Sequence, residues 1–131
     1  MDGEGEIWRK FLEEGRGFHK TVRGALRRPQ VFTPEIVQNI AAMGIEKYFM
    51  AFFTRRGMMP QNHTMRDFVE ECRAFAPLPD DLEASLLRFD ELQSICSIDD
   101  FRIAKPLPGD VPKFVDAIDR VAALAEAAVA Q

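Results

Sequence analysis

Apolar residues recur at every third or fourth position along most of this chain, which is the spacing of one face of an α-helix. No stretch alternates apolar and polar residues for long enough to predict a β-strand, and no hairpin turn separates two such stretches. The 131 residues, of which 47% are hydrophobic, suffice for one core and suit a single domain. We therefore expect one all-α domain over residues 1–131, an antiparallel up-and-down bundle of four to five helices.

Residues that favour helix ends divide this pattern into five segments. Thr33 and Pro34 suit the start of a helix, and Gly57 suits its end. Gly15 and Gly17 weaken the middle of the first segment, so we expect a bend or break there. The expected helices cover residues 4–26 and 34–56, a third that begins after Asn62 or Thr64 and ends near Phe75, a fourth that begins after Asp80 or Asp81 and ends near Cys96, and a fifth that begins after Asp110.

The second segment is apolar on more than one face, which indicates a central helix packed on several sides. Its interior Gly44 predicts the close approach of another helix. The apolar surface exceeds what the neighbours in a small bundle easily cover, and such a surplus predicts association. We expect a homodimer, the most frequent oligomer; the alternative is a monomer in which the first and last helices cover this surface completely. The residues in the surplus are Trp8, Tyr48, Phe49, Phe52, Phe53, Met58 and Met59.

The composition excludes several classes of protein. The chain has 17 Lys plus Arg against 21 Asp plus Glu, a net charge of −4, which implies no global affinity for nucleic acid; only a local basic patch could supply one. Its start is acidic and no apolar run approaches the ~20 residues that span a bilayer, which predicts a cytoplasmic protein without membrane contact. Cys72 and Cys96 form no CxxC pair, and His19 and His63 stand in unrelated contexts. We expect free thiols, no metal and no cofactor.

One face of the first segment is basic. Four cations are four, three and four positions apart, a spacing that places them on one side of a helix. Residues 1–28 carry a net charge of +2, whereas residues 80–100 carry −6. This asymmetry suits a phosphate-bearing ligand, RNA or an acidic partner surface; the alternative is a face that only solvent covers. The four cations are Arg16, Lys20, Arg23 and Arg27.

Three segments, in order, carry a family resemblance. They are 41–52 with its Ala and Glu-Lys pattern, Pro60 with 62–65 and Phe68, and 99–106 before the last helix. In residue type, order and spacing they resemble the HEPN superfamily, the higher eukaryotes and prokaryotes nucleotide-binding domain. The resemblance implies a helical bundle associated with nucleotide or RNA. It also implies a partner of the minimal nucleotidyltransferase type, as in toxin–antitoxin pairs.

The chain departs from the family pattern where the ribonuclease members carry their chemistry. Arg102 matches their Arg, but no His follows it, so we expect a domain without catalysis of its own. Asn62 and Thr64 flank His63 where the family usually has Thr and Asp. Two alternatives stay open. One is a ribonuclease-type toxin component that uses Arg56 and His63, and the other is a helical interaction module without a ligand.

Four polar residues form the candidate ligand site. Glu46 and Lys47 are neighbours on an apolar helix, where adjacent positions point about 100° apart, so at least one faces the interior or an interface. A buried charge needs a partner, and Arg102 is the candidate for Glu46. We expect Glu46, His63 and Arg102 to converge in space. The group is either an ion pair that orders a loop, or part of a pocket built by Lys47, His63 and Arg102.

Overall fold

A computed structural model describes residues 6–93 and 105–131, and these residues contain helices and no strand. The predicted all-α class is confirmed. The helix that begins at Ile7 is continuous through Gly15 and Gly17, so the expected break is wrong. The helices are α1 (Ile7–Ala25), α2 (Pro34–Arg55), α3 (Met65–Phe75), α4 (Asp80–Gln93), the short 3₁₀ helix η2 (Pro108–Asp110) and α5 (Val111–Val129).

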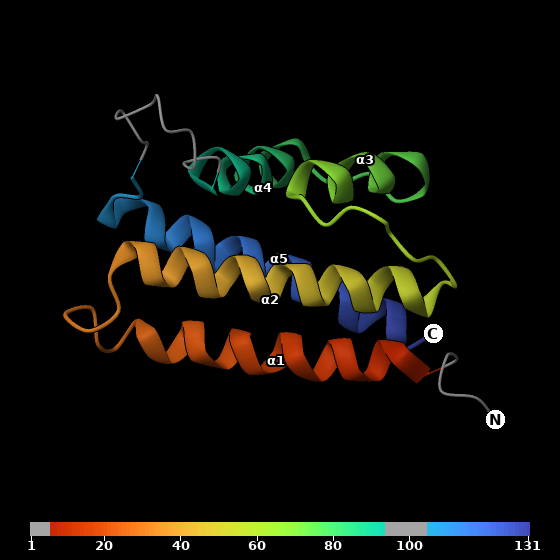
Figure 1. The fold of residues 1–131 in the computed structure, drawn as a ribbon, viewed down its shortest axis with the longest axis horizontal. Coiled ribbons are helices and arrows are strands. Elements are labelled where there is room, and N and C mark those ends of the chain that lie inside the picture. Colours follow the sequence, from red (N-terminus) through yellow and green to blue (C-terminus); the bar gives the residue numbers. More distant parts are fainter. Residues whose placement is uncertain (1–5, 94–104) are drawn as a thin grey trace.

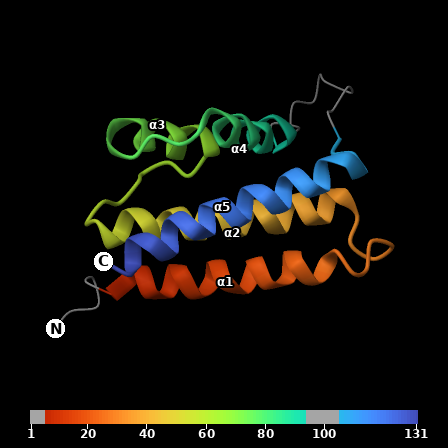
Figure 2. The ribbon, with the colours of Figure 1, turned by 180° about the vertical axis from the view of Figure 1, so that it is seen from behind.

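The helices lie in three layers (Figures 1 and 2). α1 forms one outer layer and packs mainly on α2. The middle layer consists of α2 and α5, and the other outer layer is the pair α3 and α4. The connection between α2 and α3 runs back along α2, so that α3 begins over the middle of the molecule (Figure 1). The α1–α2 turn and the C-terminal end of α2 lie at opposite ends of the molecule.

The helix starts follow local capping chemistry in two of the predicted places. The Thr33 hydroxyl accepts a hydrogen bond from the Ile36 N–H at 3.3 Å. Thr64, rather than Asn62, caps α3 by accepting from the Asp67 N–H at 3.1 Å. α2 ends before Gly57, whose φ of +77° lies in the left-handed region that favours glycine.

Of the other two predicted caps, the one for α4 is wrong and the one for α5 is right in position only. Asp80 and Asp81 lie inside the first turn of α4, where their charge complements the helix dipole. Asp110 stands at the N-cap of α5, but its carboxylate makes no capping bond to that helix; it accepts from the Leu107 N–H at 2.8 Å and closes η2. Carboxylates suit several positions around a helix start, so residue type alone misplaced Asp80 and Asp81.

The aromatic residues of α2 lie inside the protein and are no surplus at its surface. Tyr48, Phe49, Phe52 and Phe53 are each at most 3% exposed. α1 and α5 cover two sides of the helix, and Phe68 of α3 covers a third, with ring centroids 4.9 Å from Phe49 and 6.0 Å from Phe53. The reason given for the homodimer therefore fails for the aromatic residues of α2, whereas Met59 of the same predicted surplus is 59% exposed.

Gly44 lies at a close approach between helices, as predicted. A Cβ added there would meet the Ile118 side chain of α5 at 2.6 Å and the Phe18 Cβ of α1 at 3.0 Å. In α1, a Cβ added at Gly15 would meet the Tyr48 ring at 3.1 Å. Both glycines let neighbouring helices pack against α2.

The described residues also bear on the cysteine and membrane predictions. Cys72 is a buried free thiol, and loss of solvent raises its pKa to about 11. Cys96 lies outside the described residues. No helix in the described part of the chain is long and apolar enough to cross a membrane, and no group of three potential metal ligands occurs there.

Candidate functional site

Glu46 and His63 meet although they lie on different elements. Glu46 stands in the middle of α2, and His63 stands on the returning connection just before α3. The His63 Nδ1 lies 2.9 Å from the Glu46 Oε2, and its Nε2 lies 3.2 Å from the Pro60 carbonyl oxygen. Both partners are acceptors, so only the doubly protonated ring donates to both. The pair ties the connection to α2.

The His63 ring also packs on a row of stacked aromatic rings. It stacks on Phe68 with a centroid distance of 6.0 Å and an interplanar angle of 25°, and Phe68 stacks in turn on Phe49. The other face of the site is open, because the side chains of His63 and Glu46 are 42% and 34% exposed. A solvent-borne ligand can reach the pair without a change in the bundle.

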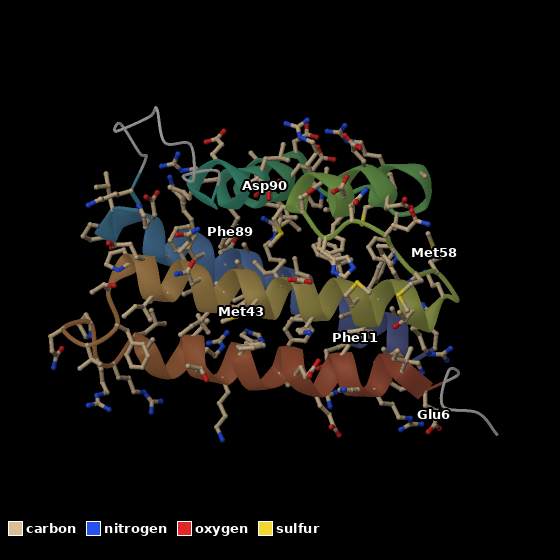
Figure 3. All side chains as sticks on the ribbon, in the orientation of Figure 1. Glu6, Phe11, Met43, Met58, Phe89 and Asp90 are labelled. Atoms are coloured by element: carbon tan, nitrogen blue, oxygen red, sulfur yellow. The ribbon has the colours of Figure 1, made fainter. Side chains whose placement is uncertain are left out.

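Lys47 faces a different part of the molecule. Its ammonium group lies 3.4 Å from the Glu14 carboxylate and 5.5 Å from the ring centre of Phe11, both on α1. Phe11 is visible between α1 and α2 in Figure 3. The structure thus brings Glu46 and His63 together and turns Lys47 to α1. Arg102 lies outside the described residues, so its convergence with Glu46 stays a prediction.

The basic face of α1 divides into paired and unpaired cations. Arg16 makes two hydrogen bonds to Glu126 of α5, at 2.7 and 2.5 Å, and Arg23 lies 2.8 Å from Asp119 of the same helix. The hydrogen bonds from Arg16 hold the pKa of Glu126 below its ordinary value. Lys20 and Arg27 are exposed, and neither side chain has an ion-pair partner among the described residues.

A second polar cluster was missed by the sequence analysis. The His19 Nδ1 lies 2.9 Å from the Tyr48 hydroxyl, and its Nε2 lies 2.6 Å from the Asp119 carboxylate. Arg23 reaches the other oxygen of the same carboxylate. Burial raises the pKa of Tyr48 to about 12, so the phenol keeps its proton. The i,i+4 spacing of His19 and Arg23 was a local signal, but nothing in the sequence pointed to Asp119.

The charge separation predicted from the sequence coincides with the layers of the fold. Residues 6–28, which include α1, carry seven Lys or Arg and three Asp or Glu. Residues 65–93, which include α3 and α4, carry three Arg and eight Asp or Glu. These segments are the two outer layers, so opposite sides of the molecule carry opposite charge (Figures 1 and 2).

Comparisons with protein-family models, with curated proteins and with solved structures find no match to this chain.

Proposed function

We propose that this protein is a non-catalytic, HEPN-like domain that associates with nucleotide or RNA. The observation that carries the proposal is a pair of exposed cations in the outer layer that contains α1. These are Lys20 and Arg27, and neither has an ion-pair partner among the described residues. They are seven positions apart in the sequence, with Lys20 inside α1 and Arg27 in the turn that follows it. Arg28 is exposed beside them. Cations in a row on one side of a protein favour contact with a phosphate backbone.

Arg16 and Arg23 contribute differently to this surface. Each is more than half exposed, yet each is bound to a carboxylate of α5. These carboxylates hold the two guanidinium groups along the edge of α1 and lower the net charge there. The phosphate contacts are therefore assigned to Lys20, Arg27 and Arg28, and Arg16 and Arg23 fix the position of α1 on α5.

The candidate site at His63 supports a binding role rather than an acid–base role. Both ring nitrogens face acceptors of the protein itself, so neither is free to exchange a proton with a substrate in this arrangement. Arg56 is the other residue of the alternative ribonuclease pair. Its guanidinium lies over the Phe52 ring, 4.1 Å from the ring centre, in the position of a cation–π contact. Glu46, His63 and Arg102 remain the proposed ligand residues of this site, whereas Lys47, proposed with them, faces α1.

The partner proposals rest on the resemblance alone. They are a nucleotidyltransferase-type partner and a place in a toxin–antitoxin pair. The cytoplasmic location is proposed separately, from the acidic start and the lack of a long apolar run. The homodimer also remains a proposal, but its surface must differ from the one first expected, because the aromatic residues of α2 are buried.

The proposal is tested by the binding of a fluorescent RNA oligonucleotide, followed by anisotropy over a range of salt concentrations. We expect the Lys20→Ala, Arg27→Ala double variant to weaken binding and to lower the salt slope by about two, one for each lost phosphate contact. Arg66→Ala is the matched control, because Arg66 is an exposed cation of the acidic layer. Undetectable binding by the unmodified protein, or equal losses in both variants, contradicts the proposal.

A further inference from the structure

The exposed apolar residues gather at one end of the molecule. Leu107 is 64% exposed, and Leu26, Val31 and Ile36 are 40–47% exposed. They come from the α1–α2 turn with its flanking residues and from the segment that enters η2. These four are most of the large apolar side chains that the described residues expose. We call this group the apolar end.

The apolar end is held in a fixed shape. The N–H groups of Val31 and Phe32 both donate to the Arg28 carbonyl at 3.0 Å, which closes the turn. A groove of about 330 Å³ runs between this turn and the start of α5. Proline lines it on both sides, which fixes the backbone before any partner arrives. The prolines are Pro29, Pro34, Pro108 and Pro112.

The rim of the apolar end is positive. Arg27, Arg28 and Lys105 are exposed next to its apolar residues in the sequence, against one exposed acid, Glu35. The Asp110 carboxylate already accepts a hydrogen bond from the Leu107 N–H at η2. Two such ends placed face to face would bring cations against cations, which opposes twofold pairing through this surface. The rim fits an acidic surface with an apolar centre.

The opposite end of the same molecule has that character. A hollow of about 520 Å³ lies between the α2–α3 connection and α3. Met59 lines it and is 59% exposed. Asp67, Glu70 and Glu71 line its other side, and neither Glu70 nor Glu71 has an ion-pair partner among the described residues. The connection reaches the end of the bundle marked by Met58 in Figure 3.

We propose that the apolar end of one copy docks head to tail into the acidic hollow of a second copy. Leu26 and Leu107 enter the hollow against Met59, and Arg27 and Arg28 face Glu70 and Glu71. Because the two surfaces lie at opposite ends, each copy keeps one of them free after pairing. The contact is heterologous, so copies add in a row and need not stop at a pair. Of the surface first expected for self-association, this contact keeps only Met59. It shares Arg27 and Arg28 with the proposed RNA contact, but the docking of two copies needs no RNA.

Sedimentation equilibrium tests the proposal on the full chain, from low micromolar to near-millimolar concentration and at low and high salt. We expect the average mass to rise with concentration and to fall with added salt. Arg28→Glu and Glu71→Arg should each weaken association by about tenfold, because each puts like charges into the contact.

An equimolar mixture of the two variants tests whether Arg28 of one copy meets Glu71 of another, and an average mass above that of two copies separates a heterologous contact from a twofold one. The intact hollow of Arg28→Glu accepts the intact apolar end of Glu71→Arg, and the two altered surfaces also complement each other. We therefore expect the mixture to associate again. Lys20→Glu is the matched control, since it should impair RNA binding and leave the mass unchanged. A single-copy mass under all conditions, insensitivity to Glu71→Arg, or a mixture that stays dissociated overturns the proposal, and none of these results bears on RNA binding.

Discussion

His19 joins three helices through its two ring nitrogens. It belongs to α1, its Nδ1 meets the Tyr48 hydroxyl of α2, and its Nε2 meets the Asp119 carboxylate of α5. Tyr48 is only 1% exposed, so its hydroxyl depends on His19 for a partner. A buried polar group without a partner costs about 1–3 kcal/mol, which makes this contact a condition for burying Tyr48.

Tyr48→Phe should lower the free energy of unfolding by about 1–2 kcal/mol, because it removes the hydroxyl and leaves the His19 Nδ1 unpaired. Chemical denaturation measures the change. The same substitution in a His19→Ala background is the control, since there the hydroxyl has already lost its partner. Equal costs in both backgrounds would show that the two side chains contribute independently.

At the scale of helices, two glycines that both lie inside a helix differ in how closely other side chains pack on them. Gly44 lies in the interior of α2 against Phe18 and Ile118, whereas a Cβ added at Gly17 of α1 would meet nothing within 4 Å. Both stand inside helices, where glycine is unfavourable by itself. Packing therefore explains the presence of Gly44 and not that of Gly17.

Gly44→Ala should destabilise the protein by about 1–2 kcal/mol, because the added methyl group displaces Ile118 and presses on the Phe18 Cβ. Gly17→Ala should stabilise it by about 0.5–1 kcal/mol through helix propensity alone. Thermal unfolding of the two variants provides the comparison. A rise in melting temperature for Gly44→Ala would mean that the helices move apart at little cost.

How far the sequence could predict the structure depends on the distance between the residues involved. Thr33 and Thr64 were identified as caps because each bonds a backbone group three residues away. The Glu46–His63 pair came from the resemblance, which brought two segments of the chain together. The contact between His19 and Asp119 spans 100 positions, and it exists only because α1 and α5, which both pack on α2, also contact each other.

At the scale of the whole molecule, the layers differ in how they are held. α2 packs against both α1 and α5, and its aromatic side chains are buried. The α3–α4 layer rests on the middle layer through Phe68 and through the contact of Phe89 with Phe114 of α5. Its two helices also bind each other, because the Asp90 carboxylate accepts the first two N–H groups of α3. Asp90 lies beside α3 in Figure 3.

Hydrogen exchange should therefore show two cooperative units. We expect the slowest amide exchange in α2 and α5, and faster, concerted exchange in α3 and α4, because fewer contacts hold their backbone to the rest. Asp90→Ala should raise exchange throughout α3, since the Met65 and Arg66 N–H groups lose their acceptor, and should leave α1 unchanged. Glu13→Ala, which removes an exposed carboxylate of α1 that has no ion-pair partner among the described residues, is the control and should change neither unit. Equal exchange rates across all three layers would mean that the bundle opens as one body.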